Sequence, residues 1–477
     1  MPASANGLPE LRPRRLLLCA ALGTALWMIP VPAGLETEAW RCFGVFAATI
    51  LALLVKPLPM GPSVLCGLLA LTVFNVIGED SKSSLQAALS GYGDTTSWLV
   101  LAAFLLGSAM IHSGLGRRIA LTLASRLGGT VTGLAYAIAG SEFILGTMVP
   151  SNTARGGGVM APIVNSLSRA LGSHPNERPK AAGEYLCLCG AHLNLVAAAT
   201  FLTGMAANGL IAKETDMQFD WGTWLLGSIV PALLSFIALP LFLRKIAPPE
   251  LKETEAARKQ ARTELDALGP WSRKEKIMLG VFLLLLFLWA SKPLHGLHTT
   301  TVALVGVAIL LLTGVYKWRE VKGNTEAWDA FVWLGGLISM ADALRETGFV
   351  AWFAEGIEGR VAGFAPMTAM LVLILVYFYS MYAFSMLTGH IKAMAAAFFL
   401  VAVGAGAPPM LAVALLAYFS NLCGCLTNYS SGPVVIYFGL GYVETGRWFR
   451  IGFLVSLLHL AIWLGAGLPW WKFLGWW

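Results

Sequence analysis

Charged residues are scarce in this chain. Asp, Glu, Lys and Arg make up only 12% of its 477 residues, whereas 57% are hydrophobic. Soluble domains carry about twice that share of charge. The shortage excludes a mainly soluble protein. Together with many long apolar runs, it predicts an all-α polytopic membrane protein with about 11 transmembrane helices in a lipid bilayer.

Cysteine and histidine are also sparse, with seven of each. Cys187 with Cys189, and Cys423 with Cys425, have a C-x-C spacing, but no further His or Cys cluster completes a metal site. All four lie inside apolar runs, where a small buried residue is the better interpretation. We therefore expect no metal and no other cofactor.

Catalytic and nucleotide-binding motifs are absent from the sequence. The run 156–158 is three glycines without the Gly-Lys-Ser/Thr ending of a phosphate loop, so we interpret it as a site of close helix packing. There is no His-Glu-x-x-His, serine elbow or paired-carboxylate motif. The basic residues gather on no soluble module. These absences argue against an enzyme and against nucleic acid as a partner.

The most hydrophilic stretch of the chain is residues 244–276. Lys and Arg are in excess there and in the N-terminal segment, which predicts that both face the cytoplasm of a bacterial inner membrane. We expect this stretch to be an amphipathic linker between two halves. The predicted domains are N-terminal scaffold helices (1–95), a first repeat (96–243), the linker (244–276), scaffold helices of the second half (277–327) and a second repeat (328–477).

The two halves carry similar polar motifs within apolar stretches. Residues 151–155 read Ser-Asn-Thr-Ala-Arg, and residues 386–390 read Met-Leu-Thr-Gly-His, with an offset of 235 residues. The surrounding stretches, 133–170 and 374–406, are each predicted to form a re-entrant hairpin. Each arm holds about 12–16 apolar residues, against about 20 for a full span. The alternative is two full spans joined by a turn in water.

The tips of these hairpins are candidate binding sites, because polar groups at membrane depth are costly unless they line one. Ser151, Asn152 and Thr153 supply donors at the first tip, where helix ends also expose N–H groups. Two facing tips would hold the two carboxylates of a substrate with four or five carbons. Further candidate binding residues in the polar segments and at a helix break are Thr200, Thr388, Thr427, Asn428, Ser430 and Pro433.

Each motif places a residue that can be cationic two positions after its Thr. A guanidinium such as that of Arg155 costs a few kcal/mol or more at the bilayer centre, so it requires a partner. That partner is either a bound anion or an internal carboxylate such as Glu142, unless the side chain reaches the interface from a shallow tip. His390 alone is equally well explained as a packing residue. Its equivalence to Arg155 favours a charge-compensating role for both.

These motifs, with those at 201–208 and 426–433, resemble the divalent anion:sodium symporter family. The likeness is closest to the exchanger branch, which includes bacterial citrate/succinate and tartrate/succinate antiporters and plastid 2-oxoglutarate/malate translocators. The resemblance implies two inverted repeats, each with a re-entrant hairpin, a homodimer and elevator-type alternating access. It also implies that exchangers carry an Arg and a His where sodium-coupled members hold cations.

Three residues depart from the pattern of that family. Met386 stands where a Ser is frequent, Asn428 replaces a His, and Lys392 stands where exchangers tend to have a small or neutral residue. Lys392 would reach an extra substrate carboxylate or extend to the membrane interface. The identity of the dicarboxylate is therefore not inferred from the resemblance.

Cationic side chains that are part of the binding site predict that the protein exchanges one substrate for another. A sodium ion leaves with the substrate, whereas Arg155 stays, so an empty site would carry unpaired charge through lipid. We expect a sodium-independent antiporter of C4 or C5 dicarboxylates, such as succinate, malate or 2-oxoglutarate. The alternative is a sodium-coupled di- or tricarboxylate symporter of the same family. A channel is disfavoured, because two broken hairpins fit one occluded site better than a continuous pore.

Overall fold

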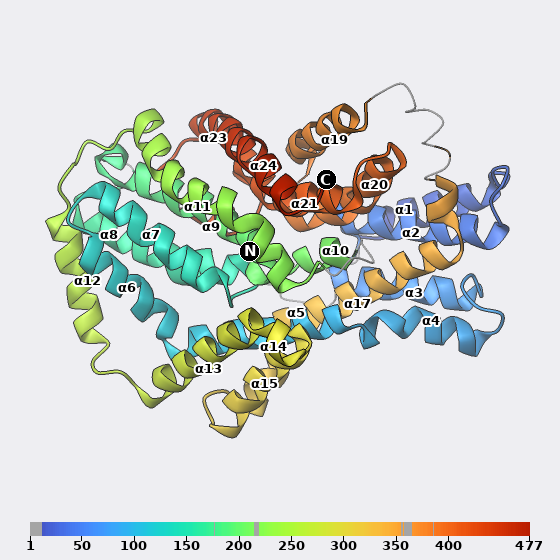
Figure 1. The fold of residues 1–477 in the computed structure, drawn as a ribbon, viewed down its shortest axis with the longest axis horizontal. Helices are drawn as coiled ribbons and strands as arrows, with labels where there is room; N and C mark the ends of the chain where they lie inside the picture. Colours follow the sequence, from blue (N-terminus) through green and yellow to red (C-terminus); the bar gives the residue numbers. More distant parts are fainter. Residues whose placement is uncertain (1–11, 176, 214–218, 354–355, 357–364, 385) are drawn as a thin grey trace. The chain divides into compact units, whose positions relative to one another are not determined.

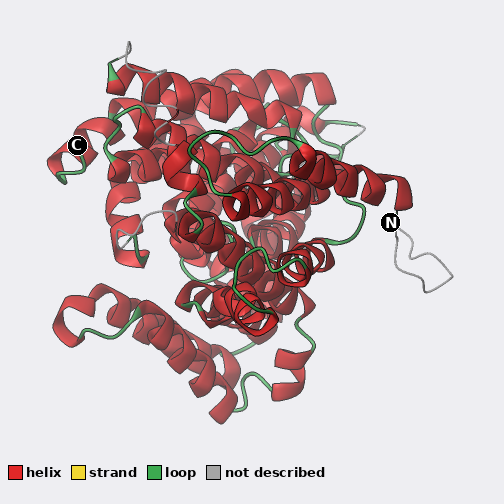
Figure 2. Ribbon diagram, turned by 90° about the vertical axis from the view of Figure 1, so that its right-hand side faces the viewer, coloured by secondary structure: helices red, strands yellow, loops and turns green. Residues whose placement is uncertain are grey.

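The computed structural model describes residues 12–175, 177–213, 219–353, 356, 365–384 and 386–477. Within these ranges the chain is helical and contains no strand (Figure 2). Helices satisfy their backbone hydrogen bonds internally, which a lipid environment requires. The expected all-helical class is confirmed.

Seven of the described helical segments are long and apolar enough to cross a membrane. They are Thr95–Ser113, Trp221–Ile246, Thr325–Glu346, Pro366–Ala383, Leu387–Gly404, Pro409–Leu426 and Thr445–Phe473. This composition fits a polytopic membrane protein. The count of about 11 transmembrane helices and the predicted domain limits stay predictions.

The chain divides into two compact units. The first unit consists of Met1–Leu101, Thr325–Ala369 and Lys392–Ala407. Its complete helices are α1 (Pro13–Met28), α2 (Thr37–Val55), α3 (Met60–Val73), α4 (Ser81–Gly93) and α17 (Thr325–Glu346).

Close packing of α4 on α17 holds the first unit together. A Cβ on Gly91 would lie 2.0 Å from the carbonyl oxygen of Gly335, so only glycine permits this approach. The Gly91 N–H then donates to Ser339 Oγ at 2.9 Å, and the Tyr92 hydroxyl donates to the Val332 carbonyl at 3.0 Å. Small residues therefore set the distance between these helices.

The second unit consists of Ala102–Asn324, Met370–Ile391 and Pro408–Trp477. Its complete helices up to the linker are α6 (Leu115–Leu127), α7 (Val131–Gly146), η1 (Thr153–Met160), α8 (Ala161–Ala170), η2 (Pro179–Ala181), α9 (Gly183–Thr200), η3 (Leu202–Gly204), α10 (Asn208–Lys213), α11 (Trp221–Ile246) and α12 (Glu255–Ala267). Those after it are α13 (Arg273–Ala290), α14 (Lys292–His295), α15 (Thr299–Leu312), α16 (Trp318–Lys322), η4 (Met381–Ala383), α21 (Pro409–Leu422), η5 (Cys423–Leu426), α22 (Gly432–Gly439), α23 (Thr445–Gly465) and α24 (Gly467–Phe473).

Three helices run from one unit into the other. They are α5 (Thr95–Ser113), α19 (Pro366–Ser380) and α20 (Leu387–Gly404). The second hairpin region is thus shared between the units, whereas the first lies wholly in the second unit.

Helix α9 is the centre of the second unit. Every one of its 18 residues is buried. It packs against α7, α8, α11, α21 and α22, and Figure 1 shows it running among the first three. A helix enclosed on all sides must satisfy its polar side chains inside the protein.

The charged linker contains α12, which lies along α6 and α8 (Figure 1). Glu264 accepts hydrogen bonds from Arg117 at 3.1 Å and from Ser166 at 2.5 Å. Nearby, Arg118 and Glu275 form a buried ion pair at 2.6 Å. The linker is therefore docked on the second unit through polar contacts.

The first predicted hairpin is a helix, an irregular break and a second helix. Helix α7 begins at the cap of Thr130, whose Oγ1 accepts from the Gly133 N–H at 3.0 Å. With 16 residues it is about 24 Å long, short of the roughly 30 Å hydrocarbon core. Residues 147–151 are not helical, and η1 and α8 follow.

The two arms of the second predicted hairpin are both helical. Pro366–Ala383 and Leu387–Gly404 each provide 18 residues that qualify as a candidate span. The reason is that η4 extends α19, and α20 continues through apolar residues beyond the motif. The two segments hold 15 and 13 apolar residues, within the expected 12–16, but their length of 18 residues does not separate a re-entrant hairpin from two spans there.

Candidate functional site

The first tip presents three half-buried polar residues, Ser151, Asn152 and Thr153. Ser151 Oγ accepts from the Ala154 N–H at 3.1 Å, which caps the start of η1. The carbonyl of Asn152 accepts from Asn194 Nδ2 of α9 at 3.3 Å. Backbone contacts therefore fix the tip, while its side chains keep some exposure to a ligand.

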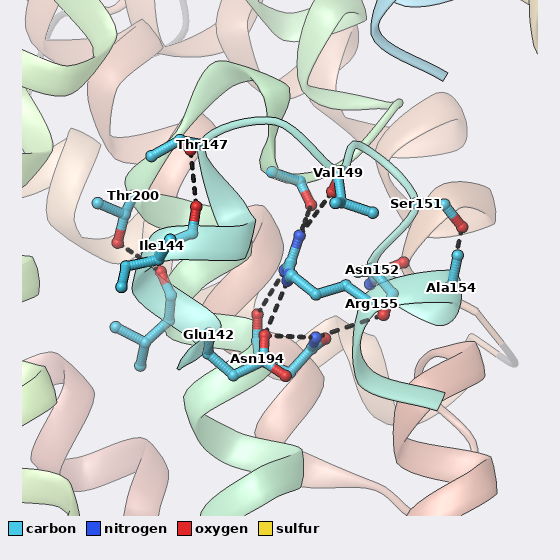
Figure 3. Close-up of polar contacts among 12 residues, drawn as sticks. Glu142, Ile144, Thr147, Val149, Ser151, Asn152, Ala154, Arg155, Asn194 and Thr200 are labelled. Atoms are coloured by element: carbon cyan, nitrogen blue, oxygen red, sulfur yellow. Dashed lines mark hydrogen bonds and ion pairs between the residues drawn. The ribbon is translucent and has the colours of Figure 1, made fainter. Parts of the chain in front are cut away.

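Arg155 lies behind this tip and is fully buried (Figure 3). Its Nε donates to Glu142 Oε2 at 2.7 Å. Its Nη1 donates to the carbonyls of Val149 at 2.8 Å and Gly204 at 3.1 Å, and its Nη2 donates to the carbonyl of Asn194 at 3.2 Å. One carboxylate and three carbonyl oxygens thus surround the guanidinium.

The partner of Arg155 in this structure is the internal carboxylate that the sequence offered as the alternative to a bound anion. Glu142 and Arg155 are both without solvent exposure. Asn194 Nδ2 also donates to Glu142 Oε2 at 2.9 Å, so α7, η1 and α9 meet at this carboxylate (Figure 3). The charge of Arg155 is offset inside the protein, and its guanidinium does not line an open surface.

Glycines bring η1 close to its neighbours. A Cβ on Gly156 would lie 2.7 Å from Asn194 Nδ2 and 2.8 Å from Pro433 Cβ, and one on Gly157 would lie 2.2 Å from Ile436 Cδ1. These distances agree with the close-packing interpretation of 156–158. The segment is a π-helix, a form that occurs frequently at functional sites.

The second tip is built around His390, which is also buried. Its Nε2 lies 2.8 Å from Ser380 Oγ and 3.0 Å from the carbonyl of Tyr377, and its ring lies 4.4 Å from the ring of Tyr377. Its Nδ1 has no hydrogen-bond partner among the described residues. Thr388 is half-buried nearby in the sequence. No acidic side chain among the described residues pairs with His390.

The two tips share a spacing that the motifs alone did not reveal. Arg155 contacts a residue 13 positions earlier, Glu142, and His390 contacts a residue 13 positions earlier, Tyr377. In each case the partner comes from the helix before the break. The equivalence of Arg155 and His390 therefore extends to the place of their partners.

One segment, residues 427–433, contacts both tips. On one side, a Cβ on Gly432 would lie 2.1 Å from Thr153 Oγ1. On the other side, the carbonyl of Ser430 accepts from the Leu387 N–H at 2.6 Å. The structure thus brings the two motifs, 235 residues apart in sequence, to one polar segment.

Within that segment the predicted binding residues differ in access. Thr427 and Ser430 are buried, and Ser430 Oγ donates to the carbonyl of Gly424 at 2.5 Å. Thr427 Oγ1 has no hydrogen-bond partner among the described residues. Asn428 is half-buried, and Pro433 is buried against η1.

Two other predicted groups are not brought to the tips. Thr200 is fully buried, and its hydroxyl donates to the Val196 carbonyl within α9 at 2.7 Å. Lys392 lies in the first unit, 6% exposed, with its Nζ 3.5 Å from the ring centre of Trp333 and 3.4 Å from Met60 Sδ. Lys392 is therefore packed inside the first unit by a cation–π contact, and both of its suggested roles stay predictions.

The sequence analysis missed Asn194 as a member of this site. Asn194 bonds to the first tip, to Glu142 and to Arg155, which makes it the hub of the network. A signal was present, because a buried helix rarely carries an amide without a polar partner. The sequence pattern did not indicate which residue would be the partner of Asn194.

Comparison with known proteins identifies the family to which this chain is similar. A profile of the family described as "Sodium:sulfate symporter transmembrane region" matches residues 12–477. The chain is 42% identical over 467 residues to YflS of Bacillus subtilis, whose name describes it as a candidate malate transporter, covering 97% of this chain and 96% of that protein. It is 37% identical over 469 residues to the chloroplastic dicarboxylate transporter 1 of Spinacia oleracea, covering 97% and 81%.

A further relative is the L-tartrate/succinate antiporter of Escherichia coli K12, 33% identical over 477 residues, covering 96% of this chain and 97% of that protein. Among solved structures, the YdaH transporter of Alcanivorax borkumensis has a similar fold, with a TM-score of 0.50 at 14% identity, covering 84% of this chain and 90% of that chain. That likeness concerns the fold alone.

Proposed function

Because the chain belongs to the family of sodium:sulfate symporter transmembrane proteins, we propose that it exchanges C4 or C5 dicarboxylates across the membrane without sodium. The names of its relatives describe transporters and not enzymes, and they include dicarboxylate transporters and an L-tartrate/succinate antiporter. The substrate class of the proposal rests on those relatives and on the donors at the two tips.

The contacts around Arg155 are the observation that supports transport without sodium. Three backbone carbonyls, from Val149, Asn194 and Gly204, converge on the guanidinium. Carbonyl oxygens freed at helix breaks are the groups with which carriers coordinate sodium. Here a tethered cation contacts the carbonyls of Val149, in the break after α7, and of Gly204, at the end of η3, together with that of Asn194 within α9. We propose that Arg155, with His390 in the second tip, replaces the sodium ions of coupled carriers.

The substrate would bind between the tips. Ser151, Asn152 and Thr153 keep partial exposure, as do Thr388 and Asn428. Hydroxyl and amide donors from both tips, with the N–H groups of the helix ends, suit two carboxylates held at opposite ends of a short chain. Ser430 and Pro433 support this arrangement from the segment that contacts both tips.

We base obligatory exchange on the cost of moving an empty site whose polar groups have lost their partners. After release of the substrate, the donors at the tips have lost their acceptors, and His390 gains a charge whenever it is protonated. Moving such a site through lipid is unfavourable, whereas a bound dianion satisfies it. Glu142 offsets Arg155 in this structure, so the net charge of the empty site depends on whether that carboxyl is ionised.

The proposal includes the architecture that the family resemblance implies. It comprises inverted repeats with re-entrant hairpins, about 11 transmembrane helices, elevator-type movement and a homodimer. It also includes a bacterial inner membrane location with the N-terminus and 244–276 in the cytoplasm, supported by their excess of basic residues.

Counterflow in reconstituted vesicles tests the proposal. Vesicles loaded with unlabelled succinate, malate, 2-oxoglutarate, tartrate or citrate should take up labelled succinate far faster than empty vesicles, in choline as well as in sodium buffer. Equal uptake by empty vesicles would exclude obligatory exchange. A strict need for sodium would favour the coupled symporter instead.

A further inference from the structure

The two oxygens of the Glu142 carboxylate differ in their hydrogen bonds. Its Oε2 accepts from Arg155 Nε at 2.7 Å and from Asn194 Nδ2 at 2.9 Å. Its Oε1 is buried and has no hydrogen-bond partner among the described residues. Burying an ionised oxygen without a hydrogen-bond partner is unfavourable. A proton on Oε1 would remove that cost while Oε2 keeps both donors.

Two more polar groups near this carboxylate are unsatisfied. Asn194 Oδ1 and the Tyr437 hydroxyl are buried without a hydrogen-bond partner in the described part of the chain. Tyr437 lies on α22, which packs against both α9 and η1. Its hydroxyl reaches α9 because position 190 is glycine, where a Cβ would lie 2.4 Å from it. Glu142 thus has polar neighbours that suit a neutral, protonated carboxyl.

Other titratable or charged groups on the helices around α7 have partners elsewhere, lie in a last turn or stack on an aromatic ring. On α6, Arg117 pairs with Glu264 and Arg118 with Glu275, while Arg126 lies in the last turn. On α11, Asp220 pairs with Lys292, Arg244 donates to Thr132, and Lys245 lies in the last turn. On α9, Glu184 pairs with Arg447, and His192 stacks on Trp448. Arg155 is the cation that faces Glu142.

We propose that Glu142 takes up a proton from water when a dicarboxylate binds at the tips, so that the Arg155–Glu142 pair changes from neutral to positive as the dianion arrives. The inference rests on the proposed function for the place of the substrate. While the pair is neutral, an incoming dianion meets no net cation from it and is repelled by the carboxylate. Protonation of Oε1 removes that repulsion and leaves the guanidinium to attract the substrate.

Linkage fixes the direction of the pH effect. If the loaded carrier binds more protons than the empty one, binding must strengthen as the pH falls through the range in which Glu142 titrates. Each dicarboxylate should then bring up to about one proton with it. A carrier whose Glu142 stays ionised throughout would show neither effect.

Calorimetry on the purified full-length protein tests this inference, with succinate as the probe. Titrations at one pH, in buffers with different ionisation enthalpies, give the number of protons taken up per succinate. We expect close to one for the wild type at the pH of strongest dependence and close to zero for Glu142→Gln, which keeps an acceptor for Arg155. Glu275→Gln, which alters the other buried Glu–Arg pair, is the matched control and should retain the wild-type value.

A second measurement uses the wild type alone, so it does not depend on whether the variant folds. Infrared difference spectra of the wild type with ¹³C-labelled succinate should gain the carbonyl band of a protonated protein carboxyl. The inference is overturned if the wild type takes up no proton and gains no such band. It is also overturned if proton uptake survives in folded Glu142→Gln and vanishes in His390→Gln. Absence of dicarboxylate binding and exchange altogether would instead refute the proposed function.

Discussion

The two tips bury a residue that can be cationic with different kinds of partner. In the first, a permanent cation, Arg155, is fully buried against a carboxylate. In the second, His390 is buried against a hydroxyl and a carbonyl, both acceptors that a neutral imidazole also suits. An imidazole can lose its charge, whereas a guanidinium cannot. A residue that is always charged needs a charged partner in lipid, and a residue that can be neutral does not.

The largest effect is expected from breaking the pair in the first tip. Arg155→Ala leaves Glu142 buried and unpaired, which should lower the free energy of unfolding by about 3–5 kcal/mol and abolish exchange. Thermal unfolding in detergent and succinate counterflow measure the two effects. Arg155→Ala/Glu142→Gln is the control: most of the stability should return while exchange stays absent. Normal counterflow in a folded single variant would remove Arg155 from the mechanism.

Adding a methyl group at a glycine tests how tightly each tip is packed. Gly432→Ala places a Cβ 2.1 Å from Thr153 Oγ1, so it should displace the first tip and slow exchange about tenfold or more. Gly389→Ala, in the second tip, meets no atom within 4 Å and should retain most of the activity. Initial counterflow rates at matched protein levels compare the two variants. Similar rates would mean that the contact at Gly432 does not position the tip.

Removing the imidazole should cost less than removing the guanidinium. His390→Gln keeps a polar group for Ser380 and leaves no buried charge behind, so we expect a loss of stability of only about 1 kcal/mol. Exchange should be slower but measurable. A loss of stability as large as that of Arg155→Ala would show that His390 is charged and paired in the folded protein.

The smallest effect is expected at the counterpart of Glu142. Tyr377→Phe removes the hydroxyl that lies 2.6 Å from Ser420 Oγ, while the backbone carbonyl that contacts His390 remains. Stability should fall by about 1 kcal/mol, with exchange close to that of the wild type. Unfolding and counterflow of this variant beside Glu142→Gln show directly whether the two partners differ in importance. Equal losses would contradict the distinction between the tips.

Several features of the molecule could be predicted from residues alone. The shortage of charge and the long apolar runs indicate helices in a membrane, because lipid leaves few other ways to satisfy the backbone. The two polar motifs, with their cationic residues, indicate where the site lies. The total length of each helical segment in the second hairpin could not be predicted, because η4 extends α19 by one short turn toward the motif at 386–390.

The sequence by itself determined that Arg155 needs a partner, because a guanidinium cannot be left unpaired at membrane depth. It offered Glu142 and a bound anion without deciding between them. Only the tertiary structure decided, by bringing α7, η1 and α9 together so that Glu142, Asn194 and three carbonyls enclose the guanidinium. The choice of partner depends on how the chain folds back at the break after α7 and on how α9 packs against it, and no local pattern encodes those distances.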